Sequence, residues 1–175
     1  MHAYRTHTCA ALTADAVGQT VRLSGWVHRK RDHGGVLFVD LRDHYGITQI
    51  VAKAGESAHD ALGAVRSEWV IKVTGTVRER SNETVNQKLP TGGIEVAATT
   101  VEVINEAKTP PFYVNEETPV DENLRWKYRY IDLRRECPKD LIRLRHDVVA
   151  FIRHHLTSRV FCVIETPTLI LSYPP

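Results

Sequence analysis

An aromatic ring, an amide and a carboxylate in the first hundred residues could together bind an unpaired nucleic-acid base. Phe38 alternates in phase with Asp40 and Arg42, opposite an apolar face, which predicts an exposed ring. Such a ring can stack on a base, at about 1–3 kcal/mol per base. Gln49 offers a donor and an acceptor, and Glu95 could accept from a guanine edge or an exocyclic amine. Singly, each also fits a rim residue or a solvated side chain. Together they indicate a groove for unstacked bases.

Basic residues lie directly before the strand that carries Phe38. Arg29, Lys30 and Arg31 fall in residues 28–35, which we expect to form a turn ending in two glycines. Such a cluster suits phosphates, although a basic turn is also common as a merely solvated one. The chain carries a net charge of only +2, so any affinity for nucleic acid must come from local clustering.

The elements that position these residues follow from hydrophobic periodicity. Strands are expected at 21–27, 36–42, 47–51, 70–77 and 94–104, with a phase slip near Ala98. Ala58, Ala61, Leu62 and Val65 recur at helical spacing between the third and fourth strands. This order predicts a mainly β fold with α, a five-stranded OB-fold barrel. An SH3-like barrel and a generic sandwich remain alternatives from the pattern alone.

The pattern breaks after residue 105. Prolines at 110, 111 and 119 exclude regular structure there, and a short helix is expected around Leu124, Tyr128 and Ile131. Pro138 suits the first turn of a long amphipathic helix from Leu141 to Leu156, and residues 160–164 could form a strand. We therefore divide the chain into an OB domain (1–106), a linker or hinge (107–137) and the start of a further domain (138–175).

Composition excludes several other classes. The three cysteines lie far apart, which argues against a disulfide framework and a zinc site. No stretch approaches the roughly 20 apolar residues of a membrane helix, and the N-terminus lacks the apolar core of a secretion signal. We expect a cytoplasmic protein with no membrane partner and no bound metal.

Several motifs, in order, resemble bacterial aspartyl-tRNA synthetases. They are residues 25–43 (GWVHRKRDHGGVLFVDLRD), 46–49 (GITQ), 89–92 (LPTG), 94–96 (IEV), 125–135 (RWKYRYIDLRR) and 164–169 (IETPTL). The last resembles motif 1 of class II synthetases, so Pro167 would belong to the dimer interface of the full-length homodimer. Related barrels occur in lysyl- and asparaginyl-tRNA synthetases, but the first-strand motif and residues 128–135 favour aspartate.

The resemblance implies roles for the candidate residues. Phe38 would stack on the central anticodon base and Gln49 would read it. Glu95 would contact the first anticodon base, and Arg31, together with the basic cluster that includes Arg29, would contact the anticodon region. Histidine at position 33 resembles the branch of the family that accepts tRNA-Asn as well as tRNA-Asp, although a simple turn histidine fits equally well.

The resemblance also implies what this chain does not contain. The family holds ATP and magnesium with motifs 2 and 3, and no such motif occurs here, so we expect no cofactor and no catalysis by this chain alone. Val160 stands where the family has a helix-ending glycine, which predicts a strained turn. The leading hypothesis is the anticodon-binding part of an aspartate–tRNA ligase that ends within motif 1. A freestanding module for single-stranded RNA and a non-functional remnant are the alternatives.

Overall fold

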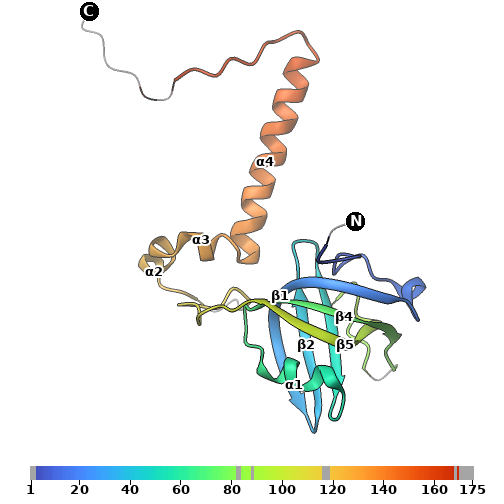
Figure 1. Ribbon diagram of the computed structural model, residues 1–175. Helices are drawn as coiled ribbons and strands as arrows, with labels where there is room; N and C mark the ends of the chain where they lie inside the picture. The colour runs from blue at the N-terminus through green and yellow to red at the C-terminus, as the bar shows by residue number, and fades with distance from the viewer. Residues whose placement is uncertain (1–2, 82–83, 88, 116–118, 168, 170–175) are drawn as a thin grey trace, which may run out of the picture. The chain divides into compact units, whose positions relative to one another are not determined.

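The computed structural model describes residues 3–81, 84–87, 89–115, 119–167 and 169, in two units, Met1–Pro110 and Pro111–Pro175. Five strands and one α-helix build the first unit (Figure 1). They are β1 (Thr20–His33), β2 (Val36–Arg42), β3 (Ile47–Lys53), α1 (Ser57–Ala64), β4 (Val70–Glu79) and β5 (Ile94–Asn105). A short 3-10 turn, Ala14–Ala16, precedes β1. The order of elements is the one that the periodicity predicts.

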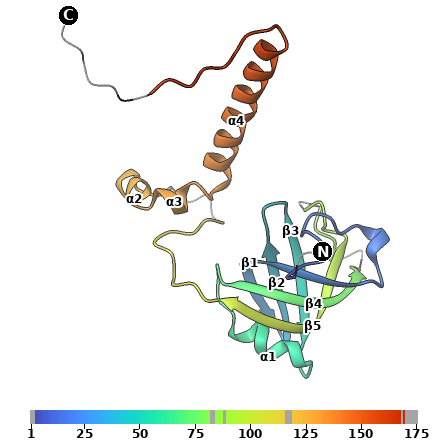
Figure 2. The same ribbon diagram turned by 45° about the horizontal axis from the view of Figure 1, so that its top comes forward.

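The five strands close into a barrel in the order β1-β2-β3-β5-β4 (Figure 2). β1 pairs with both β2 and β4, and this double pairing closes the sheet so that neither side is left as an open edge. β3 and β5 pair in parallel, while the other pairs are antiparallel. The predicted OB-fold is confirmed, and the expected phase slip appears as a register shift of β5 between Ala98 and Thr100.

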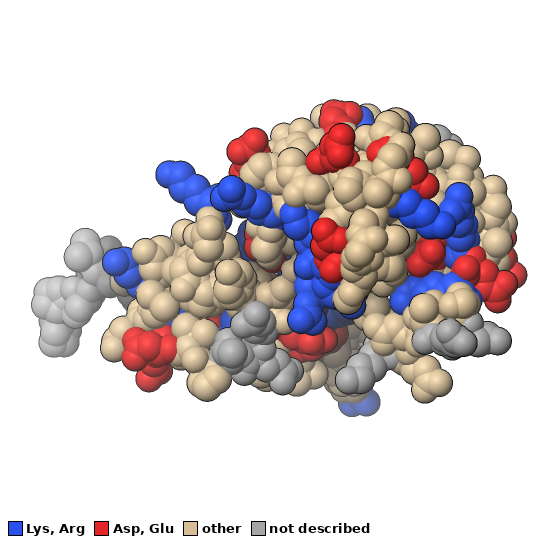
Figure 3. All heavy atoms as spheres, turned by 90° about the horizontal axis from the view of Figure 1, so that it is seen from below, with Lys and Arg blue, Asp and Glu red and all other residues tan. Residues whose placement is uncertain are grey.

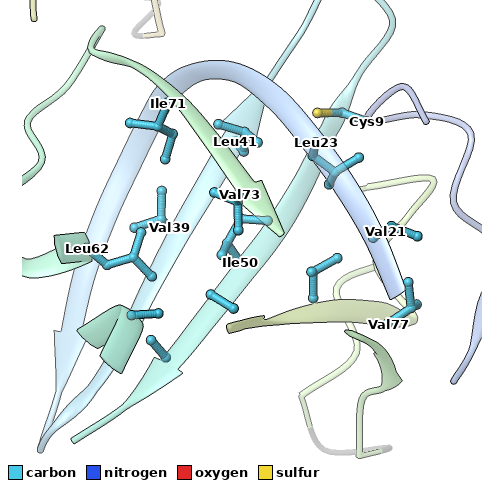
Figure 4. Packing of buried hydrophobic residues seen from close by; sticks show 14 of the residues in the cluster. Cys9, Val21, Leu23, Val39, Leu41, Ile50, Leu62, Ile71, Val73 and Val77 are labelled. Carbon is cyan, nitrogen blue, oxygen red and sulfur yellow. The ribbon is translucent and has the colours of Figure 1, made fainter. Parts of the chain in front are cut away.

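Alternating apolar side chains of the strands fill the barrel (Figure 4). Leu37, Val39 and Leu41 of β2 are at most 4% exposed, whereas the residues between them face outward. Leu62 of α1 joins this core, and α1 packs on β2, β3 and β5. Each fully buried aliphatic side chain of this kind stabilises the fold by about 1.5–3 kcal/mol.

The segment before β1 is tied to the barrel through the turn after β2. One carboxylate oxygen of Asp43 accepts from the backbone N–H groups of Tyr45 and Gly46, at 2.8 and 2.9 Å. The other accepts from the N–H of Cys9 at 2.8 Å. A Cβ at Gly46 would lie 2.9 Å from the Cβ of Ala10, so only glycine permits this approach. Cys9 is buried, and burial raises the pKa of its thiol.

Three helices build the second unit: α2 (Glu122–Lys127), α3 (Arg129–Asp132) and α4 (Glu136–Thr157). The one short helix expected around Leu124 to Ile131 is therefore two, interrupted at Tyr128. Asp132 is fully buried and pairs with Arg125 at 3.0 Å, Arg129 at 2.6 Å and Arg135 at 3.7 Å. A buried carboxylate needs such compensation.

The helix α4 contains Pro138 in its first turn, as predicted, and has no buried residue. Its end is closed by a hydrogen bond from the N–H of Phe161 to the carbonyl of Leu156 at 3.2 Å. The residue in the left-handed position of this turn is Val160, with a φ of 70°. The prediction of strain there is confirmed. No helix of the described residues is long and apolar enough to cross a membrane.

The predicted strand at 160–164 is wrong, since these residues have no regular structure. A strand needs a neighbour for its backbone groups, and within the described part of the chain none pairs with this segment. The division between the two units falls after Pro110, and the proposed three-part domain division stays a prediction.

Candidate nucleic-acid interface

A β-bulge in β1 decides which way its basic side chains face. Val27 pairs with Leu41 and Arg29 with Asp40, so His28 is an extra residue in β1. Val27 faces the core, and strict alternation would therefore have turned Arg29 inward as well. The bulge shifts the phase by one residue and places Arg29 on the outer face with Asp40.

The predicted basic turn at residues 28–35 is wrong. β1 continues to His33, and the connection to β2 is made by Gly34 and Gly35 alone, with φ of 60° and 88°. The strand extends because each of its residues from Arg29 onward has a partner on β2, up to the pair of His33 and Val36. Two residues with positive φ form the tight turn that such a hairpin favours.

Phe38 lies on the outer face of β2, outside the hydrophobic core cluster. We expect an exposed ring from the alternation, and the ring is half-buried instead. Its register partners are Arg31 on β1 and Val51 on β3, and the ring of His33 contacts it edge-on with centroids 5.8 Å apart. These neighbours line its sides and leave the ring part of the outer surface.

Arg31 is fixed beside Phe38 by an ion pair. Its guanidinium donates to both carboxylate oxygens of Asp40, each at 3.0 Å. Asp40 is only 9% exposed although it faces outward, because the arginine covers it. Both bonds come from one nitrogen, Nη2, so they tie that end of the guanidinium to the carboxylate. Arg31 is thereby held close to Asp40 and partly neutralised by it.

Gln49 and Glu95 meet on the same outer surface. The parallel pairing of β3 with β5 brings them together, and the side-chain amide of Gln49 donates to a Glu95 oxygen at 3.4 Å. In register, Gln49 also lies directly across from Asp40. Gln49 is 7% exposed, and Glu95 is half-buried. The outer faces of β1, β2, β3 and β5 thus gather Arg31, Phe38, Gln49 and Glu95 on one surface.

Sequence reasoning missed Arg80, which lies outside the strands expected at 70–77 and 94–104. It is 7% exposed, and its Nε donates to the carbonyl of Ile94 at 2.9 Å. Its Nη2 has no hydrogen-bond partner among the described residues. Burial lowers the pKa of the guanidinium, while the nearby negative charges of Glu95 and Asp40 oppose that effect. Continuing the alternation of β4 past Val77 would have placed Arg80 on the outer face.

The other members of the basic cluster separate by role. Arg29 is exposed and makes no hydrogen bond or salt bridge with a described residue, so it remains available to a phosphate. Lys30 instead donates to the carbonyl of Gly63 at 2.6 Å, at the end of α1. On the face shown in Figure 3, acidic and basic side chains lie interspersed, in keeping with the small net charge.

Pro167 is exposed and lies in the irregular segment after α4. Thr168 and residues 170–175 of the predicted motif 1 region lie outside the described residues, so the assignment of Pro167 to a dimer interface stays a prediction. No group of three His, Cys, Asp or Glu side chains within the described ranges could hold a metal ion.

Comparison with known proteins connects this surface to a family. The model of the OB-fold nucleic acid binding domain matches residues 21–104, and that of class II tRNA synthetases (D, K and N) matches residues 121–175. An aspartate–tRNA(Asp/Asn) ligase of Erythrobacter litoralis is 53% identical over 99% of this chain. One from Sinorhizobium medicae is 51% identical over the same share. The chain belongs to the aspartyl-tRNA synthetase family.

This chain spans 29% of the length of both of these aspartyl-tRNA synthetase relatives. Solved structures share the fold. An aspartyl-tRNA synthetase from Entamoeba histolytica has a TM-score of 0.82 at 21% identity, covering 93% of this chain and 39% of that one. An asparaginyl-tRNA synthetase from Pyrococcus horikoshii has a TM-score of 0.78 at 24% identity, covering 94% and 37%. The family resemblance inferred from the sequence motifs is confirmed.

Proposed function

We propose that this chain recognises the anticodon loop of tRNA-Asp as the front part of an aspartate–tRNA ligase. The observation that supports this is the single outer surface on which Phe38, Gln49, Glu95 and Arg31 gather. An aromatic ring beside an amide and a carboxylate can stack one unpaired base and read the hydrogen-bonding edges of that base and its neighbour.

Each side chain has its own task in this proposal. Phe38 stacks on the central anticodon base, and Gln49 reads that base. The hydrogen bond from the Gln49 amide to Glu95 holds the Gln49 side chain in place. Glu95 takes the first anticodon base. Arg31, held beside Phe38 by Asp40, faces the RNA, and Arg29, which has no ion-pair partner among the described residues, offers its charge to a phosphate.

The proposed substrate range includes tRNA-Asn. The relatives cited above are named for both tRNAs. In this chain the side chain at position 33 touches the proposed stacking ring, since His33 contacts Phe38 edge-on. A residue there can change the shape of the wall beside the anticodon.

In the whole enzyme, we propose, this chain selects the tRNA while other parts use ATP and magnesium to attach aspartate. We further propose that the full-length protein is a homodimer in which Pro167 belongs to the interface. Leu141, Leu144 and Phe151 of α4 are at least 60% exposed here, and burial of such side chains in an assembled enzyme would be favourable.

Titration of a fluorescent anticodon stem-loop of tRNA-Asp at two salt concentrations tests the recognition. Phe38→Ala should weaken binding by about 1–3 kcal/mol, which is roughly five- to 150-fold. Phe151→Ala, which removes an exposed ring of α4, should leave binding unchanged. Unchanged affinity in Phe38→Ala contradicts the proposal. Equal binding of unrelated single strands, with the same salt dependence, would favour a general RNA-binding module.

A further inference from the structure

Trp26 differs from the other two tryptophans of the chain. The indole N–H of Trp69 donates to the carbonyl of Ala107 at 3.1 Å, and that of Trp126 donates to Glu122 at 3.3 Å. Trp26 has no hydrogen bond and no ring contact with a described residue, and it is 41% exposed. A tryptophan with an unused donor and an exposed ring has the chemistry to stack on a base.

Trp26 lies on the same outer face as Phe38. It precedes the inward-facing Val27 and is in register with Arg42 on β2, while Phe38 is in register with Arg31. Arg42 and Phe38 are four residues apart on β2, so the two aromatic positions are separated by roughly 13 Å along the strands. That spacing leaves room for more than one nucleotide between the rings.

The surface between the two rings carries a cation that has no ion-pair partner in the described part of the chain. Arg29 is in register with Asp40, which lies midway between Phe38 and Arg42 on β2. It is exposed and makes no hydrogen bond or salt bridge with the described residues. The order along this face is therefore ring, cation, ring. This order suits a single strand whose phosphate lies between two stacked bases.

The residues beside Trp26 are held rigidly. Arg42 donates to both carboxylate oxygens of Glu68, at 2.8 and 3.1 Å, and its other terminal nitrogen lies 2.9 Å from Nδ1 of His28. Glu68 reaches this position with a φ of 65°, which is unusual for a residue other than glycine. Because Arg42 is neutralised by this pair, the free charge near Trp26 comes from Arg29.

The order of strands and the proposed anticodon contacts together indicate the direction in which the RNA would run. In the proposed function, the first anticodon base is read on β5 and the central base on β2 and β3. The strand would then run, from 5′ to 3′, from β5 towards β1, which borders β2. Trp26 lies on β1, beyond the central base in that direction.

We propose that Trp26 is a second stacking position, which takes the nucleotide immediately 3′ of the anticodon triplet, with Arg29 on one of the two phosphates that join this nucleotide, through the third anticodon nucleotide, to the central one. This inference rests on the proposed anticodon recognition. It adds a position outside the triplet that contributes affinity through stacking and carries little base preference, because every base has a stacking face.

A cycle of two changes tests the contact directly. The full chain and its Trp26→Ala variant are titrated with the anticodon stem-loop of tRNA-Asp and with the same stem-loop carrying an abasic site 3′ of the triplet. Trp26→Ala and the abasic site should each weaken binding by roughly five- to tenfold, or about 1–1.4 kcal/mol. Together they should weaken it no further than either does alone.

Control variants separate stacking from structural damage. Trp26→Phe should keep most of the affinity, and Trp126→Ala, which removes another exposed indole, should leave it unchanged. The abasic stem-loop tests the contact with the unaltered chain, so a folding defect in Trp26→Ala cannot hide the result. If the two changes multiply, or if neither weakens binding, Trp26 does not stack on this nucleotide.

The outcome distinguishes this inference from the proposed function. Loss of affinity in Phe38→Ala together with unchanged affinity in Trp26→Ala overturns only the second stacking position. Absence of specific binding by the unaltered chain overturns both.

Discussion

The imidazole of His33 contacts the ring of Phe38 edge-on, with the two centroids 5.8 Å apart and the planes at 68°. The two residues lie near the turn between β1 and β2, and the bulge in β1 puts them on one face. The residue at position 33 therefore helps to set the position of the proposed stacking ring. In the proposed recognition, position 33 would therefore affect the choice between similar anticodons through the Phe38 ring and without touching a base.

His33→Leu should change the preference of the chain between the anticodon loops of tRNA-Asp and tRNA-Asn. The edge contact is worth about 0.5–1.5 kcal/mol, so the ratio of the two dissociation constants should shift about two- to tenfold in favour of the tRNA-Asp loop. Parallel titrations with both loops measure this ratio. His44→Leu is the matched control, because His44 packs edge-on against Tyr45 instead. An unchanged ratio would refute the relaxed-specificity role.

Asp40→Asn should make binding stronger but less selective. The carboxylate neutralises Arg31, and its removal adds one net positive charge to the surface. If Arg31 then contacts a phosphate, the plot of log affinity against log salt should steepen by about 0.7. Titrations over a range of salt, with the stem-loop and with an unrelated strand, measure both effects. Asp60→Asn removes a fully exposed charge from α1 and should leave the slope as it is.

The stability of the barrel should depend on pH through His28. Burial, and then the charge of Arg42, lower the pKa of His28 below its ordinary value of 6.5. Below pH 6.5 the unfolded chain takes up a proton at His28 that the folded chain resists. Protonation therefore lowers the free energy of unfolding. The contribution of neutral His28 to the free energy of unfolding is fully present above pH 6.5. It is lost as the pH falls from there through the pKa of His28 in the folded chain.

His28→Gln should flatten this pH dependence, because glutamine cannot be protonated in that range yet still offers an acceptor to Arg42. Denaturant unfolding at a series of pH values from 7.5 downward measures the difference between variant and unaltered chain. His44→Gln, on an exposed turn, serves as the comparison. Parallel curves for His28→Gln and the unaltered chain would show that His28 does not carry the effect.

Val160→Gly should stabilise the end of α4. Val160 has a φ of 70° and a side chain that is 95% exposed, so its branched Cβ costs energy without gaining burial. Relief of that strain should be worth about 1 kcal/mol. Slower hydrogen exchange of the Phe161 amide, which bonds to Leu156, is the expected measurement. Val163→Gly, in the irregular segment, should not slow this exchange.

Alternation was enough to predict most of the barrel. Leu37, Val39 and Leu41 are buried as the period-two pattern requires. The opposite face of β2 carries Phe38 and Asp40, as expected, and Asp40 is in register with Gln49 on β3. Pairing within the barrel supports each such strand, so a local pattern and the final structure agree.

The errors arise where a long-range contact outweighs the local pattern. The basic stretch before Gly34 resembles a turn, but pairing with β2 keeps it in a strand, and the extra residue His28 cannot be seen without the partner. The local pattern does not single out Arg80, because its burial depends on contacts with the start of β5. Residues 160–164 have strand-forming side chains but no partner strand among the described residues.

The carboxylate of Asp43 has a practical consequence for shortened versions of this protein. The domain match begins at residue 21, yet the Cys9 backbone donates to Asp43 and the Cys9 side chain is only 1% exposed. A recombinant protein started at the domain match would lose that donor and uncover the apolar surface beneath Cys9 and Leu12. The part of the barrel weakened in this way lies at the turn between β2 and β3. Reduced RNA affinity in such a protein would therefore reflect damage to the barrel and should not be attributed to Phe38, Gln49 or Glu95.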